Sequence, residues 1–226
     1  MKGRVIAVSG IDTGIGKTVA TGHLAKSLAA SGIGVITQKV AQTGGEGISA
    51  DIAAHREIMG IGLQGVDLDG TTCPYVFACP ASPHLAAALE GREIDLLAIR
   101  RSTFLLQRQY DLVLLEGAGG LLVPLNGNLL FADYLRDAGY PLVLVTSPRL
   151  GSINHTLLSI EACRSRGIEL RAVLYNRYGE EPGPIADDTR RVIGLALHRY
   201  GMDSVPLIDL GEGGFAPDAD ALLAKI

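Results

Sequence analysis

The chain has 226 residues, of which 47% are apolar and 19% are charged, and its formal net charge is −4. This composition allows one α/β domain with a sizeable core and argues against wholesale disorder. The charge is spread without a basic block, so we expect no nucleic-acid surface, and no apolar run approaches the length of a membrane span. We expect no signal peptide. No Cys-x-x-Cys pair suggests zinc or a disulfide framework, so we expect a reduced, cytoplasmic protein with free Cys73, Cys79 and Cys163.

Apolar runs of strand length alternate along the chain with segments of helical periodicity. The predicted strands are Arg4–Ser9, Gly34–Lys39, Leu112–Glu116, Leu142–Thr146, Leu170–Tyr175 and Val205–Ile208. The predicted helices are Thr18–Ser31, Ser49–Met59, Pro83–Leu89, Asp95–Gln109, Phe131–Ala138, Ser152–Arg166 and Asp187–Tyr200. Such alternation is typical of a mostly parallel sheet with helices on both faces. We therefore predict a single doubly wound α/β domain over residues 1–226.

The first predicted strand runs into a glycine-rich loop, Gly10-Ile-Asp-Thr-Gly-Ile-Gly16-Lys17-Thr18. Glycines let several backbone N–H groups point at one anion, and the following helix adds its positive dipole end. Lys17 can reach terminal phosphates, and the Thr18 hydroxyl can bind Mg²⁺. The alternative is a glycine-rich turn with a surface lysine. The strand before the loop and the helix after it favour phosphate binding, and with it a fold like that of P-loop NTPases.

Polar residues stand at the ends of three predicted strands. Lys39 and Glu116 end the second and third, and Asn176 follows the strand Leu170–Tyr175. Ligands of parallel sheets gather beyond the carboxyl ends of the strands, so we expect these residues to converge. A carboxylate such as Glu116 helps to hold Mg²⁺ in phosphate-loop enzymes, although a solvated residue before a turn is the alternative. Lys39 is equally compatible with neutralising an acyl phosphate and with a surface position.

Several predicted helices begin at residues that suit a helix start and also suit a ligand. Asp51 fits a second metal ligand or a first-turn carboxylate that the helix dipole favours. Asp95, Ser82 and Ser152 fit N-caps. The start of the helix within Leu150–His155 offers free N–H groups to a carboxylate, or is simply a well-capped helix.

Taken together, these motifs resemble those of the dethiobiotin synthetase family. They follow the order of that family and cover nearly the whole chain. The stretches that carry the resemblance are Gly10–Thr18, Gln38–Gly44, Ser82–His84, Glu116–Gly120 and Leu150–His155, with Asn176 and Pro206.

The resemblance implies a cytoplasmic, homodimeric ligase that carboxylates 7,8-diaminononanoate with CO₂, phosphorylates the carbamate with ATP and closes the ring of dethiobiotin. The implied catalytic residues are Lys17 and Lys39. The implied ATP-binding residues are Gly14, Ile15, Gly16, Lys17, Thr18, Val19, Asp51, Glu116, Gly117, Ala118, Gly119, Asn176, Arg177 and Pro206. The implied Mg²⁺ ligands are Thr18, Asp51 and Glu116. The implied substrate-binding residues are Thr13, Thr43, Ser82, Gly119, Gly120 and Asn154, the last contributed from the other subunit.

Two alternatives share the ATP-binding core. Corrinoid-amidating synthetases normally add a glutamine-hydrolysing domain with a catalytic cysteine, for which 226 residues leave no room. Switch ATPases that position chromosomes, septa or cargo typically have a lysine near the start of the loop, where this chain has Ile11 and Asp12. We also find no basic surface or membrane-targeting helix of the kind such ATPases often carry.

Overall fold

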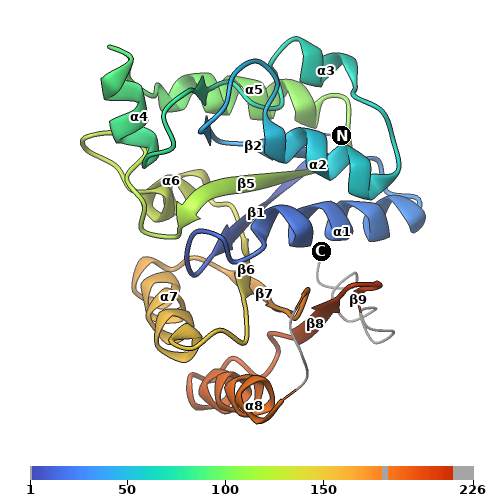
Figure 1. Ribbon diagram of the computed structural model, residues 1–226, viewed down its shortest axis with the longest axis vertical. Coiled ribbons are helices and arrows are strands. Elements are labelled where there is room, and N and C mark those ends of the chain that lie inside the picture. The colour runs from blue at the N-terminus through green and yellow to red at the C-terminus, as the bar shows by residue number, and fades with distance from the viewer. Residues whose placement is uncertain (1, 180–182, 216–226) are drawn as a thin grey trace.

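The computed structural model describes residues 2–179 and 183–215 of the chain (Figure 1). Within these residues one sheet has the strand order β2-β5-β1-β6-β7-β8-β9. All its neighbours pair in parallel except β8 and β9. The strands are β1 (Arg4–Gly10), β2 (Val35–Lys39), β5 (Leu112–Gly120), β6 (Leu142–Thr146), β7 (Leu170–Asn176), β8 (Leu207–Gly211) and β9 (Gly214–Phe215). A separate parallel pair joins β3 (Gln42–Thr43) to β4 (Val76–Phe77).

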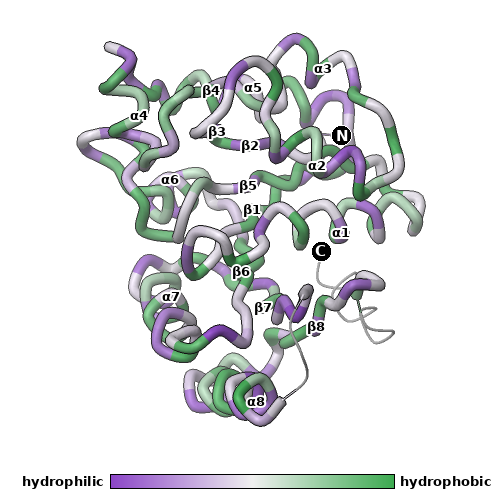
Figure 2. The backbone as a smooth tube through the Cα atoms, viewed as in Figure 1, coloured by the Kyte–Doolittle hydropathy of each residue, from purple (hydrophilic) through white to green (hydrophobic). Residues whose placement is uncertain are grey.

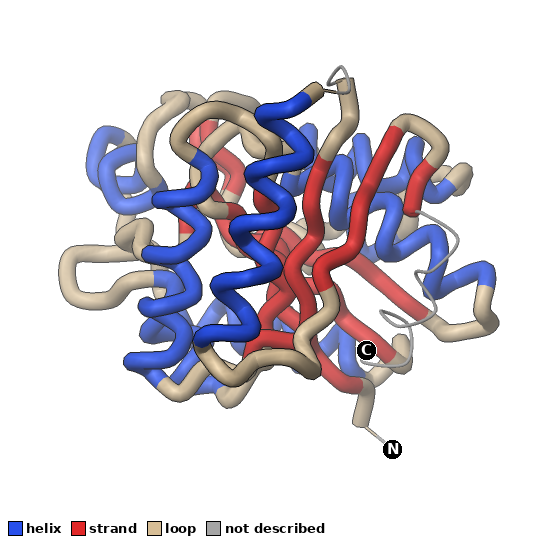
Figure 3. The backbone as a smooth tube through the Cα atoms, turned by 90° about the horizontal axis from the view of Figure 1, so that it is seen from below, coloured by secondary structure: helices blue, strands red, loops and turns tan. Residues whose placement is uncertain are grey.

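Helices cover the sheet on both sides, as Figure 3 shows in a view that places the strands between them. Helices α1 and α2 pack on each other and on β2, and α1 also contacts β5 and β1. With this strand order, the rule that crossovers between parallel strands are right-handed places α5 to α8 on the opposite face. Helix α6 packs on α7, and α7 packs on α8. The helices are α1 (Lys17–Ala30), α2 (Ala50–Met59), α3 (Gly65–Leu68), α4 (Pro83–Leu89), α5 (Leu96–Gln107), α6 (Phe131–Ala138), α7 (Ser152–Arg166) and α8 (Pro184–Arg199).

The central strands form the middle of the core, because helices remove both faces of the sheet from water. The apolar side chains of β5 from Leu112 to Leu115 and those of β6 from Leu142 to Val145 are fully buried. Figure 2 shows hydrophobic residues along β1 and β6 in the interior of the molecule. Near-continuous apolar runs are typical of parallel strands that are covered on both faces. Within the described residues no helix is both long enough and apolar enough to cross a membrane.

The predicted elements are present, and the differences lie at their ends and in the longest connection. β5 continues past Glu116 to Gly120, so Glu116 lies inside the strand and not at its end, because Gly120 still pairs with Gly10 of β1. Gly151, with φ of 92°, is the N-cap of α7, which makes the predicted cap Ser152 the first helical residue. The long connection between α2 and α4, for which no element was predicted, contains α3 and β4. The predicted domain 1–226 also includes residues 1, 180–182 and 216–226, which lie outside the described residues.

Candidate functional site

The loop between β1 and α1 has the backbone shape of an anion-binding turn. Gly14 and Gly16 have φ of 68° and 87°, a region that glycine enters at little steric cost. Gly16 is also the N-cap of α1 and makes no side-chain capping bond, so the N–H groups of the first helical turn lack a side-chain partner. These donors and the positive end of the helix dipole suit a phosphate.

Lys17 lies across this loop and not in solvent. Only 7% of the residue is exposed, and its Nζ donates a hydrogen bond to the carbonyl oxygen of Asp12 at 2.8 Å. Burial, together with the charge of Lys39, lowers the pKa of Lys17 to about 8. The ammonium is therefore held ready near the loop with few competing partners.

Two lysines, two carboxylates and a hydroxyl converge beside the loop from β2, β5, α1 and α2. Sheet pairing sets Glu116 of β5 level with Lys39 of β2 and with Val8 of β1. Lys39 Nζ donates to Glu116 Oε1 at 2.7 Å and to the Gly117 carbonyl at 3.0 Å, and it also forms an ion pair with Asp51. Thr18 Oγ1 donates to Asp51 Oδ1 at 3.0 Å and lies 3.4 Å from Glu116 Oε1.

Opposite charges keep this buried cluster ionised. Burial alone would raise the pKa of Glu116, but the charge of Lys39 and the contact with His55 hold that pKa well below its usual range. Burial would lower the pKa of Lys39, but Glu116 and Asp51 outweigh it and raise that pKa. A carboxylate that is charged at neutral pH inside the sheet is suited to bind a cation.

A cleft of about 450 Å³ opens above this cluster at the carboxyl ends of the strands. Its lining includes most of the residues predicted from the sequence and adds Ala41 and Gln42. The predicted residues that line it are Thr13, Gly14, Gly16, Lys17, Thr18, Val19, Lys39, Thr43, Asp51, Glu116, Ala118 and Gly119. Gln42 was missed, and its Oε1 accepts hydrogen bonds from Ser49 Oγ at 2.7 Å and from the Asp51 N–H at 3.2 Å. It therefore positions the start of α2 and the Asp51 carboxylate with it.

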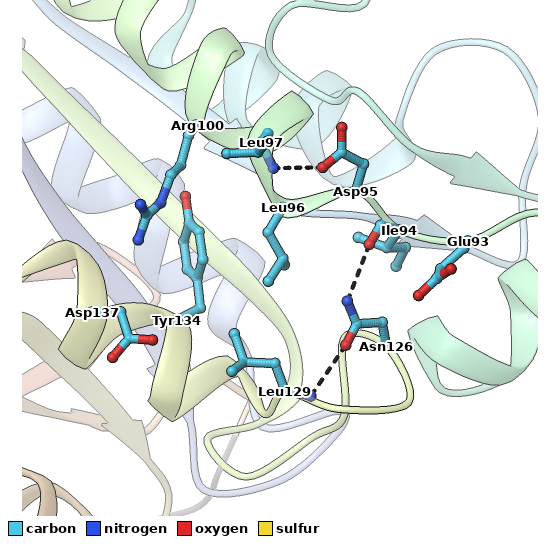
Figure 4. A pocket seen from close by; sticks show the side chains of 10 residues that line it. All are labelled: Glu93, Ile94, Asp95, Leu96, Leu97, Arg100, Asn126, Leu129, Tyr134 and Asp137. Carbon is cyan, nitrogen blue, oxygen red and sulfur yellow. Dashed lines mark hydrogen bonds between the residues drawn. The ribbon is translucent and has the colours of Figure 1, made fainter.

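A larger cavity, of about 550 Å³, lies between α5 and α6 and contains none of the predicted site residues (Figure 4). Its polar contacts are local, such as the bonds that Asp95 Oδ1 accepts from Leu97 N and that Asn126 Nδ2 donates to the Ile94 carbonyl. The concentration of charged and hydrogen-bonding groups is at the smaller cleft, which we take as the candidate site.

Comparison with known proteins gives consistent results across nearly the whole chain. A family model described as an AAA domain matches residues 4–205. The chain is 66% identical over 218 residues to the ATP-dependent dethiobiotin synthetase BioD of Chlorobaculum tepidum, covering 96% of this chain and 91% of the relative. The chain belongs to the dethiobiotin synthetase family. It is also 57% identical over 178 residues to BioD 2 of Haemophilus influenzae, covering 79% and 93%.

Solved structures confirm the predicted fold. A ParA family ATPase from Chlorobium tepidum superposes with a TM-score of 0.55 at 16% identity, covering 98% of this chain and 90% of that one. FtsY from Thermotoga maritima superposes with a TM-score of 0.53 at 19% identity, covering 99% and 68%. At these identities the likeness shows the fold alone, which is the doubly wound sheet of P-loop NTPases.

The donor set at the cleft fits Mg²⁺. This ion prefers oxygen ligands in octahedral geometry and usually takes only one or two carboxylates from the protein, with water and phosphate completing its shell. Thr18 Oγ1 and the carboxylates of Asp51 and Glu116 provide three such oxygens from three different elements. Across residues 2–179 and 183–215 no group of three or more His, Cys, Asp and Glu side chains could hold a metal by itself. A site that depends on phosphate for part of its shell agrees with both observations.

Three residues predicted to bind ATP lie near the ends of β7 and β8. Asn176 and Arg177 lie at the carboxyl end of β7, whereas Pro206 lies at the amino end of β8. Asn176 Nδ2 donates to the carbonyl of Ile15 at 3.1 Å, which places it against the loop. Arg177 follows it and pairs with Asp187 of α8 at 2.7 Å. Pro206, however, precedes β8 and accepts from Val173 N, whereas the residue level with Asn176 is Leu210. Pro206 is four residues before Leu210, which puts it about 13 Å from that level, toward the amino ends of the strands. The predicted strand Val205–Ile208 had been set too early.

Other predicted residues do not line the cleft. Ile15 is buried in the core, and Gly117 contributes its carbonyl to Lys39. Ser82 is the N-cap of α4, as expected, but its hydroxyl makes no capping bond. Gly120 borders a neighbouring hollow of about 420 Å³ that also includes Asp12 and His155. Asn154 is exposed on the first turn of α7.

His55 is the main residue that the sequence interpretation missed. It is fully buried in α2, with Nε2 2.9 Å from Glu116 Oε2 and Nδ1 3.0 Å from Thr37 Oγ1. One available signal was its position four residues after Asp51, which puts both side chains on the same face of the helix. A single histidine in an amphipathic helix gives no further indication of its partner.

Proposed function

We propose that this protein is an ATP- and Mg²⁺-dependent ligase that makes dethiobiotin from 7,8-diaminononanoate and CO₂. One amine of the substrate takes up CO₂ and loses a proton to give a carbamate. A carbamate oxygen attacks the γ-phosphorus of ATP, which releases ADP and leaves a mixed anhydride of carbamate and phosphate. The second amine attacks the carbonyl carbon, phosphate leaves, and the ureido ring closes.

The observation that carries this proposal is the convergence of two cations with a Mg²⁺-type oxygen set on one cleft. Lys39 Nζ is bonded to Glu116 at 2.7 Å and paired with Asp51, while Thr18 Oγ1 reaches the same two carboxylates at 3.4 and 3.0 Å. Phosphoryl transfer needs positioning and charge neutralisation more than a protein nucleophile. The family to which the chain belongs is named for ATP-dependent dethiobiotin synthesis.

In this proposal the loop residues from Gly14 to Val19 hold the phosphates of ATP, with Lys17 on the terminal ones. Thr18, Asp51 and Glu116 would hold Mg²⁺, which would supply charge neutralisation at the phosphates. Lys39 compensates both carboxylates in the ligand-free cleft. Its ammonium would also stabilise negative charge on the carbamate and on the phosphoryl group. Asn176, which lies against the loop, contacts the adenine.

The diamine lies on the other side of the cleft, along Thr13, Thr43 and Gly119. Gly120 and Ser82 border it, and Asn154 at the exposed start of α7 serves the other subunit of a homodimer. This last assignment agrees with the exposure of Asn154 and with the free N–H groups at the start of α7. We infer a cytoplasmic location, where ATP is available, and no nucleic-acid or membrane partner.

The direct test is to incubate the protein with ATP, Mg²⁺, bicarbonate and 7,8-diaminononanoate and to detect dethiobiotin by mass spectrometry. Product should appear in proportion to the ADP formed and should require all four components. Lys17→Ala and Glu116→Ala should abolish it while the circular dichroism spectrum stays that of a folded protein. ATP turnover that ignores the diamine, or near-normal synthesis by either variant, would contradict the proposal.

A further inference from the structure

The two oxygens of the Glu116 carboxylate have different neighbours. Oε1 accepts from Lys39 Nζ at 2.7 Å and lies 3.4 Å from Thr18 Oγ1, on the side that faces the cleft. Oε2 is on the side away from these groups, 2.9 Å from His55 Nε2. Neither Glu116 nor His55 has any exposed surface. The histidine therefore holds one oxygen in a position that leaves the other for the cleft.

The direction of the hydrogen bonds follows from a chain of buried groups behind His55. Arg56 Nη1 donates to Thr37 Oγ1 at 2.8 Å, because a guanidinium can only donate. The Thr37 hydroxyl has one hydrogen of its own, and the other neighbour of this oxygen is His55 Nδ1 at 3.0 Å. If Thr37 donates to Nδ1, then Nε2 carries the ring hydrogen and donates to Glu116. This arrangement gives every one of these polar atoms a partner of the correct kind.

This series of hydrogen-bonded groups begins at Arg56, which is held by Asp67 in the connection that follows α2. Asp67 accepts from Arg56 Nε at 2.9 Å and from Arg56 Nη2 at 2.8 Å. It also accepts from Thr72 Oγ1 at 2.8 Å and from Gln64 N at 2.7 Å. Because Arg56 and Asp67 are 1% and 4% exposed, water competes little for these bonds. The orientation of the His55 ring is therefore set by groups that do not themselves touch the cleft.

A purely space-filling residue would not need this arrangement. An apolar side chain at position 55 would leave Glu116 Oε2 without its hydrogen-bond donor and Thr37 without its acceptor, and buried polar groups are costly to leave unpaired. Carboxylates that bind metals are in turn hydrogen-bonded by a second layer of residues, whose loss reduces metal affinity.

We propose that His55 is a positioning residue that orients the Glu116 carboxylate for Mg²⁺, and that Thr37 and Arg56 set the direction of its hydrogen bond. This rests on the proposed function only in so far as Glu116 is a Mg²⁺ ligand. His55 touches neither substrate nor metal, and acts through Glu116.

The test measures how much Mg²⁺ strengthens nucleotide binding, by titrating a non-hydrolysable ATP analogue calorimetrically in excess Mg²⁺ and again in EDTA. The Kd in EDTA divided by the Kd in Mg²⁺ measures how strongly metal and nucleotide binding are coupled, separately from turnover and from nucleotide contacts. His55→Leu should reduce this ratio about 10- to 100-fold. His55→Gln should keep it within about threefold, because its amide N–H can replace Nε2–H as donor to Glu116.

Thr103→Val is the matched control for the loss of a buried hydrogen bond. Thr103 Oγ1 bonds Gln38 Oε1 at 2.8 Å in the interior of α5 and does not contact Glu116. This variant should lose thermal stability without a change in the ratio of Kd values. If His55→Leu fails to fold, Thr37→Val and Thr37→Ser test the same hydrogen bonds. Only the valine variant should lower the ratio, because serine keeps the hydroxyl group.

Three outcomes are distinguishable. A ratio that falls in His55→Leu and Thr37→Val but is retained in His55→Gln, Thr37→Ser and Thr103→Val supports the positioning role. An unchanged ratio in His55→Leu or Thr37→Val, or equal losses in His55→Leu and His55→Gln, overturns it while the proposed function stands. A wild-type protein whose nucleotide binding ignores Mg²⁺ overturns the magnesium assignment itself, and this inference with it.

Discussion

Gly16 offers the sharpest test of how the loop is built, because two separate costs meet at this residue. Its φ of 87° is left-handed, and a Cβ added there would overlap Asn176 Nδ2 and lie 3.1 Å from Asn176 Cγ. A non-glycine residue in this conformation costs about 1–2 kcal/mol. Displacing Asn176 also breaks its hydrogen bond to the Ile15 carbonyl, which costs about 1 kcal/mol more. We expect Gly16→Ala to lower the free energy of unfolding by about 2–3 kcal/mol.

Gly14→Ala is the matched control. Gly14 has φ of 68°, but no atom lies within 4 Å of an added Cβ, so only the conformational cost applies. The reduced entropy of the unfolded chain offsets both variants equally and cancels in their comparison. Urea unfolding followed by circular dichroism without nucleotide should give Gly16→Ala a free energy of unfolding about 1 kcal/mol below that of Gly14→Ala. In thermal unfolding this corresponds to a difference of about 2–4 °C in Tm.

A double variant separates the two costs further. Asn176→Ala removes the group that an added Cβ would strike, so Gly16→Ala should cost less in that background than in the wild type. If Gly16→Ala is as stable as Gly14→Ala, or if the energetic effects of the changes at positions 16 and 176 simply add, then the contact with Asn176 does not constrain the loop.

Three further predictions concern the charged groups of the cleft. Because the pKa of Lys17 is lowered to about 8, its positive charge is lost as the pH rises through that value. The Kd for ATP should therefore rise about tenfold per pH unit above 8. A Kd that stays constant in calorimetric titrations from pH 7 to 9.5 would refute this. The pKa of Glu116 is depressed in the folded protein, so the stability that its carboxylate contributes is present above the ordinary pKa of 4.5 and is lost as the pH falls below it. Urea unfolding of Glu116→Gln should therefore show a shallower loss of stability from pH 5 to 3 than the wild type. Parallel curves for the two proteins would disprove the link between this carboxylate and stability. Lys39→Ala should lower kcat at least about 100-fold while the Kd for ATP stays within about threefold, and loss of nucleotide binding instead would show that Lys39 acts in the ground state.

The amino-acid sequence alone identified the parts of the fold that depend on local pattern. The strands β1 and β6 and the helices α6 and α7 were predicted with at most one residue of error, because their apolar periodicity and their end signals lie within a few residues. The glycine loop was equally clear, since strand, loop and helix are consecutive. The expectation that Lys39, Glu116 and Asn176 lie near the carboxyl ends of their strands needed only the rule for ligand sites in parallel sheets.

Tertiary structure decided what depends on partners far apart in the chain. The local pattern favoured a helix-start role for Asp51 over a metal site, and only packing of α2 on α1 brings it to Thr18, 33 residues away. His55 is 61 residues from Glu116, and no local pattern pairs them. The predicted bounds Val205–Ile208 were wrong, since β8 spans Leu207–Gly211. A shift of two or three residues is invisible in the local pattern, but it moves a residue such as Pro206 from the carboxyl end of the strand to its amino end. Sequence period specifies which elements form, whereas strand order and register determine which side chains meet.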